Sequence, residues 1–372
     1  MSKHKHPTAS QLSKSRPSLE LKMVAAWQAQ AWWLWLLLPV SWLYGAVVLV
    51  RRQLYDKGLL SRYKAPIPVL VVGNITLGGS GKTPLIIELV KYLQSQDIRV
   101  GVISRGYGGD ESVMPKVVTA TSRPEQVGDE PCLIFRETQA CVAVCPNRQQ
   151  AIELILKQQP DTQLIIADDG LQHYKLQRDI EWIVVDSGRG FGNKQLLPTG
   201  FLREPLSRLK QGTVIFHQKP APHNSLASSQ QPVSDVSDRL TMQLMPNALE
   251  PLLANQSAQD KPNPNSANNQ VYAMSGIGYP QRFFDTLTSL GYQVIKKPMP
   301  DHHQFSEADL LPLSDYPVVV TAKDAVKIAP LVANNPLLKQ RSIWVLPVQA
   351  QLSDSCYIWL RQQLKALKVL SD

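Results

Sequence analysis

The chain has 372 residues, of which 44% are hydrophobic and 19% are charged, and its formal net charge is +9. These values describe a globular chain that is long enough for two domains. A net positive charge of this size is compatible with binding to nucleic acid, to anionic lipid or to a phosphorylated substrate. Charge alone therefore does not choose among these partners. The four cysteines do not suggest a disulfide framework. Cys141 and Cys145 stand in the apolar run ACVAVC, which predicts buried thiols in a reducing compartment.

The N-terminal part of the chain has a membrane signature. Residues 1–20 are polar and basic without periodicity, which predicts a disordered terminus. Ala31 to Val50 carries no charged residue, and about 20 apolar residues suffice to cross a bilayer. Pro39 predicts a kink, so a spanning helix and a helix lying in one leaflet both stay open. A signal peptide and a buried core helix are the alternatives.

Basic residues follow this apolar segment directly: Arg51, Arg52, Lys57, Arg62 and Lys64. Such a flank favours anionic headgroups and the cytoplasmic face of a membrane. We therefore expect a membrane-associated helix with a basic flank over 21–64. Nucleic-acid binding is the least supported partner, because these basic residues flank an apolar segment and do not interleave with aromatic residues on a globular face.

The stretch from Ile67 to Tyr92 reads IPVLVVGNITLGGSGKTPLIIELVKY. An apolar strand pattern, a glycine-rich turn and a helix pattern follow one another, which predicts a loop whose backbone N–H groups bind phosphate oxygens. Lys82 would reach the β- and γ-phosphates, and the Thr83 hydroxyl would ligate Mg²⁺. Thr76 stands where the general pattern has glycine. The expected nucleotide-binding residues of this loop are Thr76, Gly78, Gly79, Ser80, Gly81, Lys82 and Thr83.

From Ile67 onwards, strand and helix patterns alternate. The predicted strands are 67–73, 98–104, 140–145, 163–168, 181–186 and 212–217, and the predicted helices are 84–95 and 147–158. This alternation predicts an α/β fold with a mostly parallel sheet and helices on both faces, as in P-loop NTPases. Ligands then bind at the carboxyl ends of the strands.

The domain organisation follows from shifts in composition. We assign 65–217 to a P-loop kinase domain and 218–270 to a linker with a polar insertion at 256–270 and a short strand at 240–244. The αβ pattern returns in 271–372, which predicts a second, smaller α/β domain. Its elements are the strand VYAMS, helices near 280–290 and 306–312, and the strands YQVIKK, YPVVV and SIWVLPV.

Polar clusters stand at the ends of several predicted strands. LIIADDGLQH ends an apolar strand with Asp168 and Asp169, the Walker B arrangement in which a carboxylate holds Mg²⁺ beside the phosphate loop. SRGYGG places Arg105 at the same edge, where it would neutralise charge on a phosphoryl group or bind a phosphate of the acceptor. An acidic turn that ends a strand and a surface arginine are the alternatives.

Two further motifs carry candidate acid–base groups. VGDEP presents Asp129 in a turn between glycine and proline, and DHHQF places His302 and His303 in the second domain. From spacing alone, either histidine is as readily structural as catalytic. A hydroxyl acceptor needs a proton acceptor within reach, and an Asp–His pair supplies one. A domain other than the phosphate-loop domain would deliver this proton-accepting group across a cleft.

Taken together, these motifs resemble the tetraacyldisaccharide 4'-kinases of lipid A biosynthesis. The matching pieces are, in chain order, GNITLGGSGKTP (73–84), SRGYGG (104–109), GDEP (128–131), DDGLQH (168–173), LREPLSRL (202–209), DHHQF (301–305) and TAKDAVK (321–327). The resemblance implies an ATP- and Mg²⁺-dependent kinase at the cytoplasmic face of the bacterial inner membrane. Its substrate would be an acylated glucosamine disaccharide 1-phosphate, phosphorylated on the 4'-hydroxyl to lipid IVA. No protein partner is implied.

The resemblance also assigns roles by position. Lys82 and Thr83 match the phosphate and Mg²⁺ residues, and Asp168 and Asp169 match the metal region. Asp129 matches the proposed catalytic base, and His302 matches the histidine that assists it, in preference to His303. Arg203 and Glu204 match a loop on the nucleotide side, and Thr76 is usual in the family's loop.

The rival interpretations are a membrane-associated P-loop NTPase acting as a switch or motor and a non-enzymatic membrane scaffold. A GTPase would carry N-K-x-D, and the nearest string, TAKD at 321–324, has its lysine one place too late. Nucleotide hydrolysis without lipid distinguishes a motor from a kinase.

Overall fold

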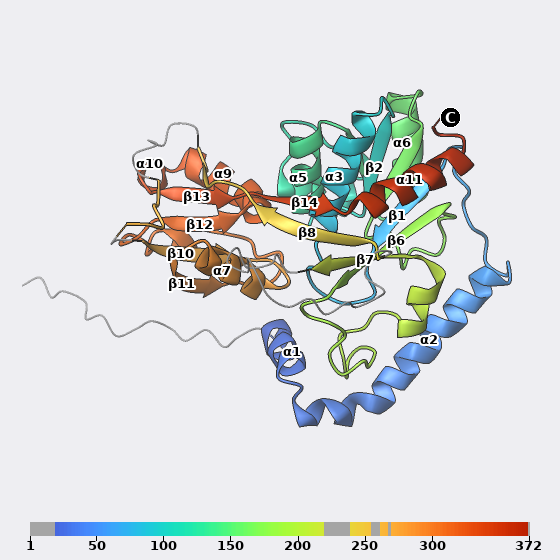
Figure 1. Ribbon diagram of the computed structural model, residues 1–372, viewed down its shortest axis with the longest axis horizontal. Coiled ribbons are helices and arrows are strands. Elements are labelled where there is room, and N and C mark those ends of the chain that lie inside the picture. Colours follow the sequence, from blue (N-terminus) through green and yellow to red (C-terminus); the bar gives the residue numbers. More distant parts are fainter. Residues whose placement is uncertain (1–18, 219–238, 254–260, 267–268, 371–372) are drawn as a thin grey trace, which may run out of the picture.

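The computed structural model of the protein describes residues 19–218, 239–253, 261–266 and 269–370. Residues 1–18 of the predicted disordered segment lie outside the described residues. Residues 19 and 20, its last two residues, are the start of a helix, α1 (Leu19–Gln28). Within the described chain, two α/β units stand side by side, and a long N-terminal helix lies along the larger one (Figure 1).

The larger unit is built on a mostly parallel sheet whose centre is the strand before the glycine-rich loop. In spatial order its strands are β14 (Val348–Leu352), β8 (Thr241–Pro246), β7 (Thr213–Gln218), β6 (Ile180–Asp186), β1 (Val69–Gly73), β5 (Leu164–Asp168), β2 (Val100–Ser104), β4 (Cys141–Val144) and β3 (Lys116–Val117). Only β14 and β3 pair antiparallel with their neighbours among these described strands. The predicted parallel sheet is confirmed.

Helices cover both faces of this sheet, because strands buried on both sides need an apolar layer above and below. One hydrophobic cluster contains side chains of α3 (Lys82–Gln94), α5 (Asp129–Thr138) and α11 (Asp354–Ala366), and the opposite cluster contains α6 (Arg148–Gln158). Cys141 and Cys145 are buried free thiols, as expected. Short helical turns complete the unit: η2 (Glu111–Val113), α4 (Pro124–Val127) and η3 (Leu206–Gln211).

The smaller unit has its own parallel sheet, in the order β11 (Gln293–Pro298), β10 (Gln270–Ser275), β12 (Val318–Thr321) and β13 (Ile343–Leu346), with β9 (Glu250–Pro251) antiparallel at its edge. One face packs on α9 (Ala322–Asn334) with the short helices α8 (Glu307–Leu310) and α10 (Pro336–Lys339), and the other packs on α7 (Pro280–Ser289). The sequence analysis did not predict α9.

The chain crosses between the two units twice, and this corrects the predicted division. β8 and β14 run from one unit to the other (Figure 1), and both belong to the larger sheet. The C-terminal helix α11 also packs in the core of the larger unit. The assignment of all of 271–372 to a second domain is therefore wrong from β14 onwards. An apolar strand pattern identifies a strand but does not specify which sheet it joins, because that pairing is non-local.

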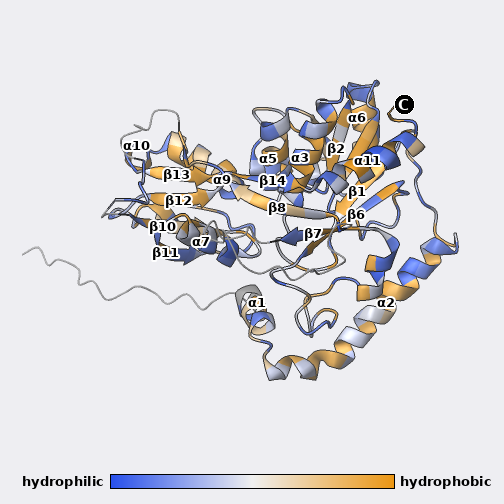
Figure 2. Ribbon diagram, in the orientation of Figure 1, coloured by the Kyte–Doolittle hydropathy of each residue, from blue (hydrophilic) through white to orange (hydrophobic). Residues whose placement is uncertain are grey.

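The N-terminal region forms η1 (Trp32–Leu37) and α2 (Leu38–Asp56). Among the described residues, Trp32–Asp56 is long and apolar enough to cross a membrane, by length and composition. Figure 2 shows that apolar residues dominate α2 until its polar C-terminal end. Large apolar side chains are exposed along it, with Trp42 at 68% and Leu43 at 67%. Ser41 and Gly45 are buried and mark the opposite face.

Candidate active site

The glycine-rich loop joins β1 to the N-terminus of α3, as predicted. Gly78 and Gly81 have φ values of +89° and +93°, a region that favours glycine. A Cβ atom at Gly81 would lie only 3.0 Å from Nδ1 of His217. The Ser80 hydroxyl is buried and has no hydrogen-bond partner among the described residues. The loop thus leaves the Ser80 hydroxyl unpaired within the described residues, close to the N-terminus of α3, where an anion binds favourably.

Two cations converge on Asp169, which follows β5. Lys82 Nζ lies 3.5 Å from Asp169 Oδ1, and Arg203 donates a hydrogen bond of 2.9 Å to Asp169 Oδ2. Burial works to raise the pKa of Asp169, but the charges of Lys82 and Arg203 outweigh it and hold that pKa well below its usual range. The left-handed backbone of Asp169 (φ +46°) turns the chain at this point.

Asp168, the last residue of β5, has a different environment. It is 1% exposed, and its Oδ2 accepts a hydrogen bond of 3.0 Å from the Ser104 hydroxyl. Burial, followed by the charges of Glu130 and Asp169, raises the pKa of Asp168 above its usual range. Its Oδ1 has no hydrogen-bond partner among the described residues. A buried carboxylate oxygen without a donor is suited to receive a cation.

Asp129 is the first residue of α5 and meets His302 from the smaller unit. Nδ1 of His302 lies 3.2 Å and 3.1 Å from the two carboxylate oxygens of Asp129. Asp129 is only 4% exposed. His303 instead packs edge-on against Phe305 and faces Asp309. The structure thus brings Asp129 together with His302, the histidine that the sequence analysis preferred.

Two lysines of α9 complete the surroundings of Asp129. Lys327 Nζ lies 3.4 Å from Asp129 Oδ2, and Lys323 Nζ lies 4.0 Å from the same oxygen. Burial works to raise the pKa of Asp129, but the hydrogen bond from His302 and the charges of both lysines hold that pKa well below its usual range. The pKa of His302 is raised, because its hydrogen bond with Asp129 outweighs the effect of its burial.

The smaller unit also touches the glycine-rich loop. A Cβ atom at Gly278 would lie 2.7 Å from Cα of Gly78, so the turn between β10 and α7 packs directly on the loop. Arg282 of α7 pairs with Asp186 at the end of β6. His217, at the end of β7, donates from Nδ1 to the carbonyl of Ser80. The loop is therefore held from both units.

Two predicted site residues have surroundings that differ from those of the other candidate site residues. Arg105 follows β2, but its side chain is 61% exposed and its ion pair within the described chain is with Glu111 at 3.8 Å. Glu204 is fully buried, and its two carboxylate oxygens accept hydrogen bonds from Gln172 and Tyr174. A direct contact between Glu204 and a nucleotide is therefore wrong; the residue fixes the loop that carries Arg203.

Sequence reasoning missed several residues of this site. They are Asn74, Ser104, Arg148, Gln172, Lys323 and Lys327. The sequence contains one signal that would have placed the two lysines on a helix. TAKD has the Thr-x-x-Asp spacing of a helix start, and in the structure Thr321 caps α9 by accepting a hydrogen bond from the Asp324 amide. That start places Lys323 and Lys327 one turn apart on the same helix face.

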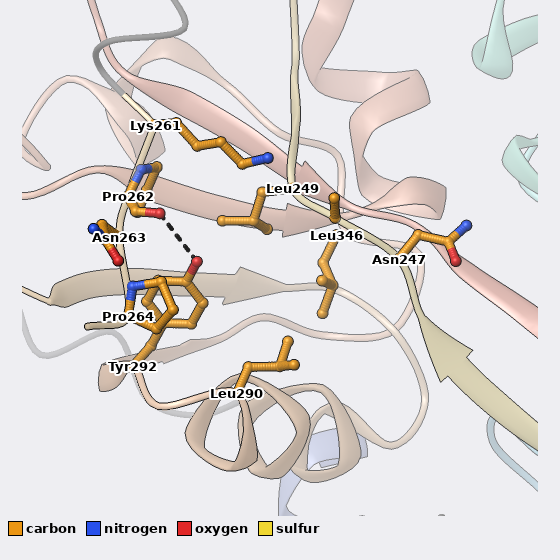
Figure 3. A pocket seen from close by; sticks show the side chains of 10 residues that line it. Asn247, Leu249, Lys261, Pro262, Asn263, Pro264, Leu290, Tyr292 and Leu346 are labelled. Atoms are coloured by element: carbon orange, nitrogen blue, oxygen red, sulfur yellow. Dashed lines mark hydrogen bonds between the residues drawn. The ribbon is translucent and has the colours of Figure 1, made fainter. Parts of the chain in front are cut away.

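A cavity of about 440 Å³ lies apart from these groups, in the smaller unit. Figure 3 shows its lining, which includes Leu249, Tyr292 and Leu346 with Lys261 at the rim. It contains no cluster of acid–base groups among its lining residues. The convergent charges therefore favour the edge between the two units as the active site.

Comparison with known proteins shows which family the chain is similar to. The model of the tetraacyldisaccharide-1-P 4'-kinase family matches residues 33–365. The tetraacyldisaccharide 4'-kinase of Psychrobacter cryohalolentis is 56% identical, covering 95% of this chain and 98% of that protein. The corresponding protein of Pasteurella multocida is 44% identical, covering 88% and 93%.

A solved structure extends the likeness to the fold. The crystal structure of LpxK from Aquifex aeolicus in complex with ATP has a TM-score of 0.65 and 26% identity, covering 89% of this chain and 98% of that one. The family match over residues 33–365 includes α2 and the elements of both units. This chain belongs to the tetraacyldisaccharide-1-P 4'-kinase family.

Proposed function

We propose that this protein transfers the γ-phosphoryl group of ATP to the 4'-hydroxyl of a tetraacylated glucosamine disaccharide 1-phosphate, forming lipid IVA. The observation that carries the proposal is the meeting of Asp129 and His302 beside the glycine-rich loop, in a chain of this kinase family. A nucleotide-hydrolysing switch has no need of a buried carboxylate–histidine pair delivered by a second unit.

The nucleotide would bind on the glycine-rich loop. Thr76, Gly78, Gly79, Ser80 and Gly81 supply backbone groups and a free hydroxyl, followed by Lys82 and Thr83 at the start of α3. Lys82 adds a positive charge that the β- and γ-phosphates need. Arg203 holds Asp169 in place from the neighbouring loop.

The residues present fit a magnesium ion. Mg²⁺ prefers hydroxyl and carboxylate oxygens and commonly takes only one or two carboxylates from the protein. Thr83, Asp168 and Asp169 would hold it. Oδ1 of Asp168 is buried without a hydrogen-bond partner in the described residues, and Oδ1 of Asp169 faces Lys82 Nζ at 3.5 Å. When bound, the ion supplies neutralisation of phosphate charge.

Asp129 is the proposed proton acceptor, and His302 is the residue that orients it. As the sugar oxygen forms its bond to the γ-phosphorus, the bond from that phosphorus to the bridging oxygen breaks, the hydroxyl proton passes to Asp129, and ADP leaves. A carboxylate of low pKa suffices, because little proton transfer is required before a loose phosphoryl transition state. Exposed Arg105 would bind a phosphate oxygen at the same edge of the sheet.

The N-terminal helix would place this site where its lipid substrate lies. Its exposed tryptophans and leucines suit the bilayer, and the basic residues at its end suit anionic lipids of the cytoplasmic face of the inner membrane. The acyl chains of the substrate would then stay in the membrane during the reaction.

The proposal is tested by incubating the enzyme with γ-labelled ATP, with and without the disaccharide 1-phosphate in detergent micelles. A kinase transfers label to the lipid and releases little inorganic phosphate without it. Substantial hydrolysis in the absence of lipid, with no labelled lipid in its presence, would identify an NTPase switch or motor and overturn the proposal.

A further inference from the structure

The α9 helix presents both of its lysines to the proposed proton acceptor. Lys323 and Lys327 are four residues apart, so they lie on one face of the helix, and α9 packs against α5, which begins at Asp129. Lys327 is 6% exposed, and Lys323 has a side chain that is 15% exposed. Burying an ammonium group is costly unless it is paired, so such placement requires a reason.

Lys327 stands between two buried carboxylates. Its Nζ lies 3.4 Å from Asp129 Oδ2 and 3.4 Å from Asp324 Oδ1. Asp324 is itself fixed, because its Oδ2 accepts hydrogen bonds from the Gly276 amide and the Thr321 hydroxyl. Lys327 therefore ties a carboxylate of the larger unit to a rigid carboxylate of the smaller unit.

Lys323 acts on the histidine. Its Nζ lies 3.4 Å from Nε2 of His302 and 3.0 Å from Glu130 Oε1. An ammonium group only donates hydrogen bonds, so Nε2 of neutral His302 must accept and the ring proton must sit on Nδ1. Nδ1 is the nitrogen that faces both oxygens of Asp129. Lys323 thus selects the tautomer that donates to Asp129.

We infer that Lys323 and Lys327 are positioning residues for phosphoryl transfer, which keep Asp129 ionised and oriented only when the smaller unit is docked against α5. The inference rests on the proposed function of Asp129 as proton acceptor. The His302 hydrogen bond and both lysine contacts come from the smaller unit. Proton acceptance is thereby coupled to the docking of that unit.

Other titratable and charged groups near Asp129 also influence how its ionisation depends on pH. Around Asp129 and its partners gather Glu130 and Cys132 on α5, Asp301 and His302 in the turn after β11, Tyr107 after β2, and Lys323, Asp324 and Lys327 on α9. The charged side chains of α3 have other partners: Lys82 pairs with Asp169, Lys91 pairs with Glu137, and Glu88 accepts hydrogen bonds from Tyr357 and Gln349. Of the two α9 lysines, Lys327 has its ammonium group closer to the Asp129 carboxylate.

The test is the pH dependence of kcat in Lys327→Met, Lys327→Arg and the exposed control Lys339→Met on α10. Removing the positive charge raises the pKa of Asp129, so the acid limb of the kcat profile moves to higher pH. We expect the loss of kcat in Lys327→Met to be largest, about tenfold, at the lowest pH at which the enzyme stays folded and smaller near pH 9, with the KM for ATP within about threefold of wild type. Lys327→Arg should restore most of kcat, and Lys339→Met should match wild type.

The double variant Asp129→Asn/Lys327→Met separates positioning from general destabilisation. If Lys327 acts through Asp129, adding its substitution to Asp129→Asn causes little further loss of kcat. Additive losses, or an unchanged acid limb in Lys327→Met, would overturn the inference. If Lys327→Met does not fold, the same comparisons are made with Lys323→Met at the more exposed site. Near-normal kcat in Asp129→Asn alone would instead refute the proposed proton acceptor.

Discussion

At the scale of single residues, three neighbouring aspartates have different electrostatic surroundings. Asp169 faces Lys82 and Arg203, and Asp129 faces His302 and the α9 lysines. The Asp168 carboxylate accepts a hydrogen bond from Ser104 and has no ion pair among the described residues. The pKa of Asp168 is raised while those of the other two are lowered. Opposite shifts in one site are typical of groups with separate chemical roles.

Replacing Asp129 by asparagine should isolate its role as proton acceptor. The amide keeps the shape of the side chain but cannot accept the hydroxyl proton, so we expect kcat to fall by about 10²- to 10⁴-fold. ATP affinity, measured by equilibrium binding, should change little, because the glycine-rich loop is untouched. A variant that turns over at near-wild-type rate would show that another group takes the proton.

Acid pH should lower the stability of the folded protein by protonating Asp129. Because the pKa of Asp129 is lower in the folded protein than in the unfolded chain, its ionised form adds stability above about pH 4, the unfolded value. That stability is lost as pH falls through the folded pKa. Thermal melts between pH 3 and pH 7 should show a smaller acid-induced decrease in Tm for Lys327→Met than for wild type, because this change removes a charge that lowers the pKa of Asp129 and a lysine does not itself titrate in that range. An equal decrease in both proteins would contradict the account.

At the scale of elements, the N-terminal helix is joined through one segment, residues 196–203, to the glycine-rich loop. The Ser41 hydroxyl of α2 contacts the Leu196 carbonyl and Thr199, and Tyr44 donates to the carbonyl of Arg203. The same segment pairs with the glycine-rich loop, where the Leu77 amide donates to the Phe201 carbonyl. One side of α2 is therefore a structural support, and the other side is exposed and apolar.

Ser41→Ala should consequently affect more than helix docking. It leaves the Thr199 amide and hydroxyl without their partner, which costs about 1–3 kcal/mol of unfolding free energy. We also expect weaker ATP binding, because the supported segment pairs with the loop. Val40→Ala, on the exposed side of α2, is the matched control. Equal melting temperatures and ATP affinities in the two variants would rule out this support.

The elements differ in how far their sequences predict them. β1, the glycine-rich loop and α3 follow from local pattern, because glycine spacing and apolar periodicity specify them without distant contacts. The Asp129–His302 pair was predicted from motifs, but its lysines were missed because α9 was not identified as a helix. The buried position of Glu204 depends on Gln172 and Tyr174, which no local pattern places beside it.

At the scale of the whole molecule, the two units share one site but not one continuous stretch of chain. The sequence predicts two α/β units, yet β14 and α11 return to the larger one after the smaller is complete. Such a return is set by strand pairing between β8 and β14, which lie far apart in sequence. α5 of the larger unit packs on α9 of the smaller unit, and the proposed catalytic pair Asp129–His302 also joins the two units.

Membrane attachment is a property of the whole molecule that the exposed face of α2 should determine. Replacing Trp42 and Leu43 by aspartate removes two large apolar side chains from that face. Each such side chain contributes about 1.5–3 kcal/mol when buried, so partitioning should weaken at least about tenfold. Sedimentation with anionic vesicles measures this, and Lys339→Met serves as the surface control. Unchanged partitioning would show that another surface anchors the protein.

The central claim is that the assembled site phosphorylates one particular hydroxyl of its lipid. The most direct measurement is to isolate the lipid product and locate the new phosphate by phosphorus–proton correlation NMR. The account predicts a correlation between the new phosphorus and the proton on carbon 4' of the distal glucosamine, absent from the product mixture of Asp129→Asn. A phosphate on any other oxygen, or no phosphorylated lipid from the wild-type enzyme, would contradict it.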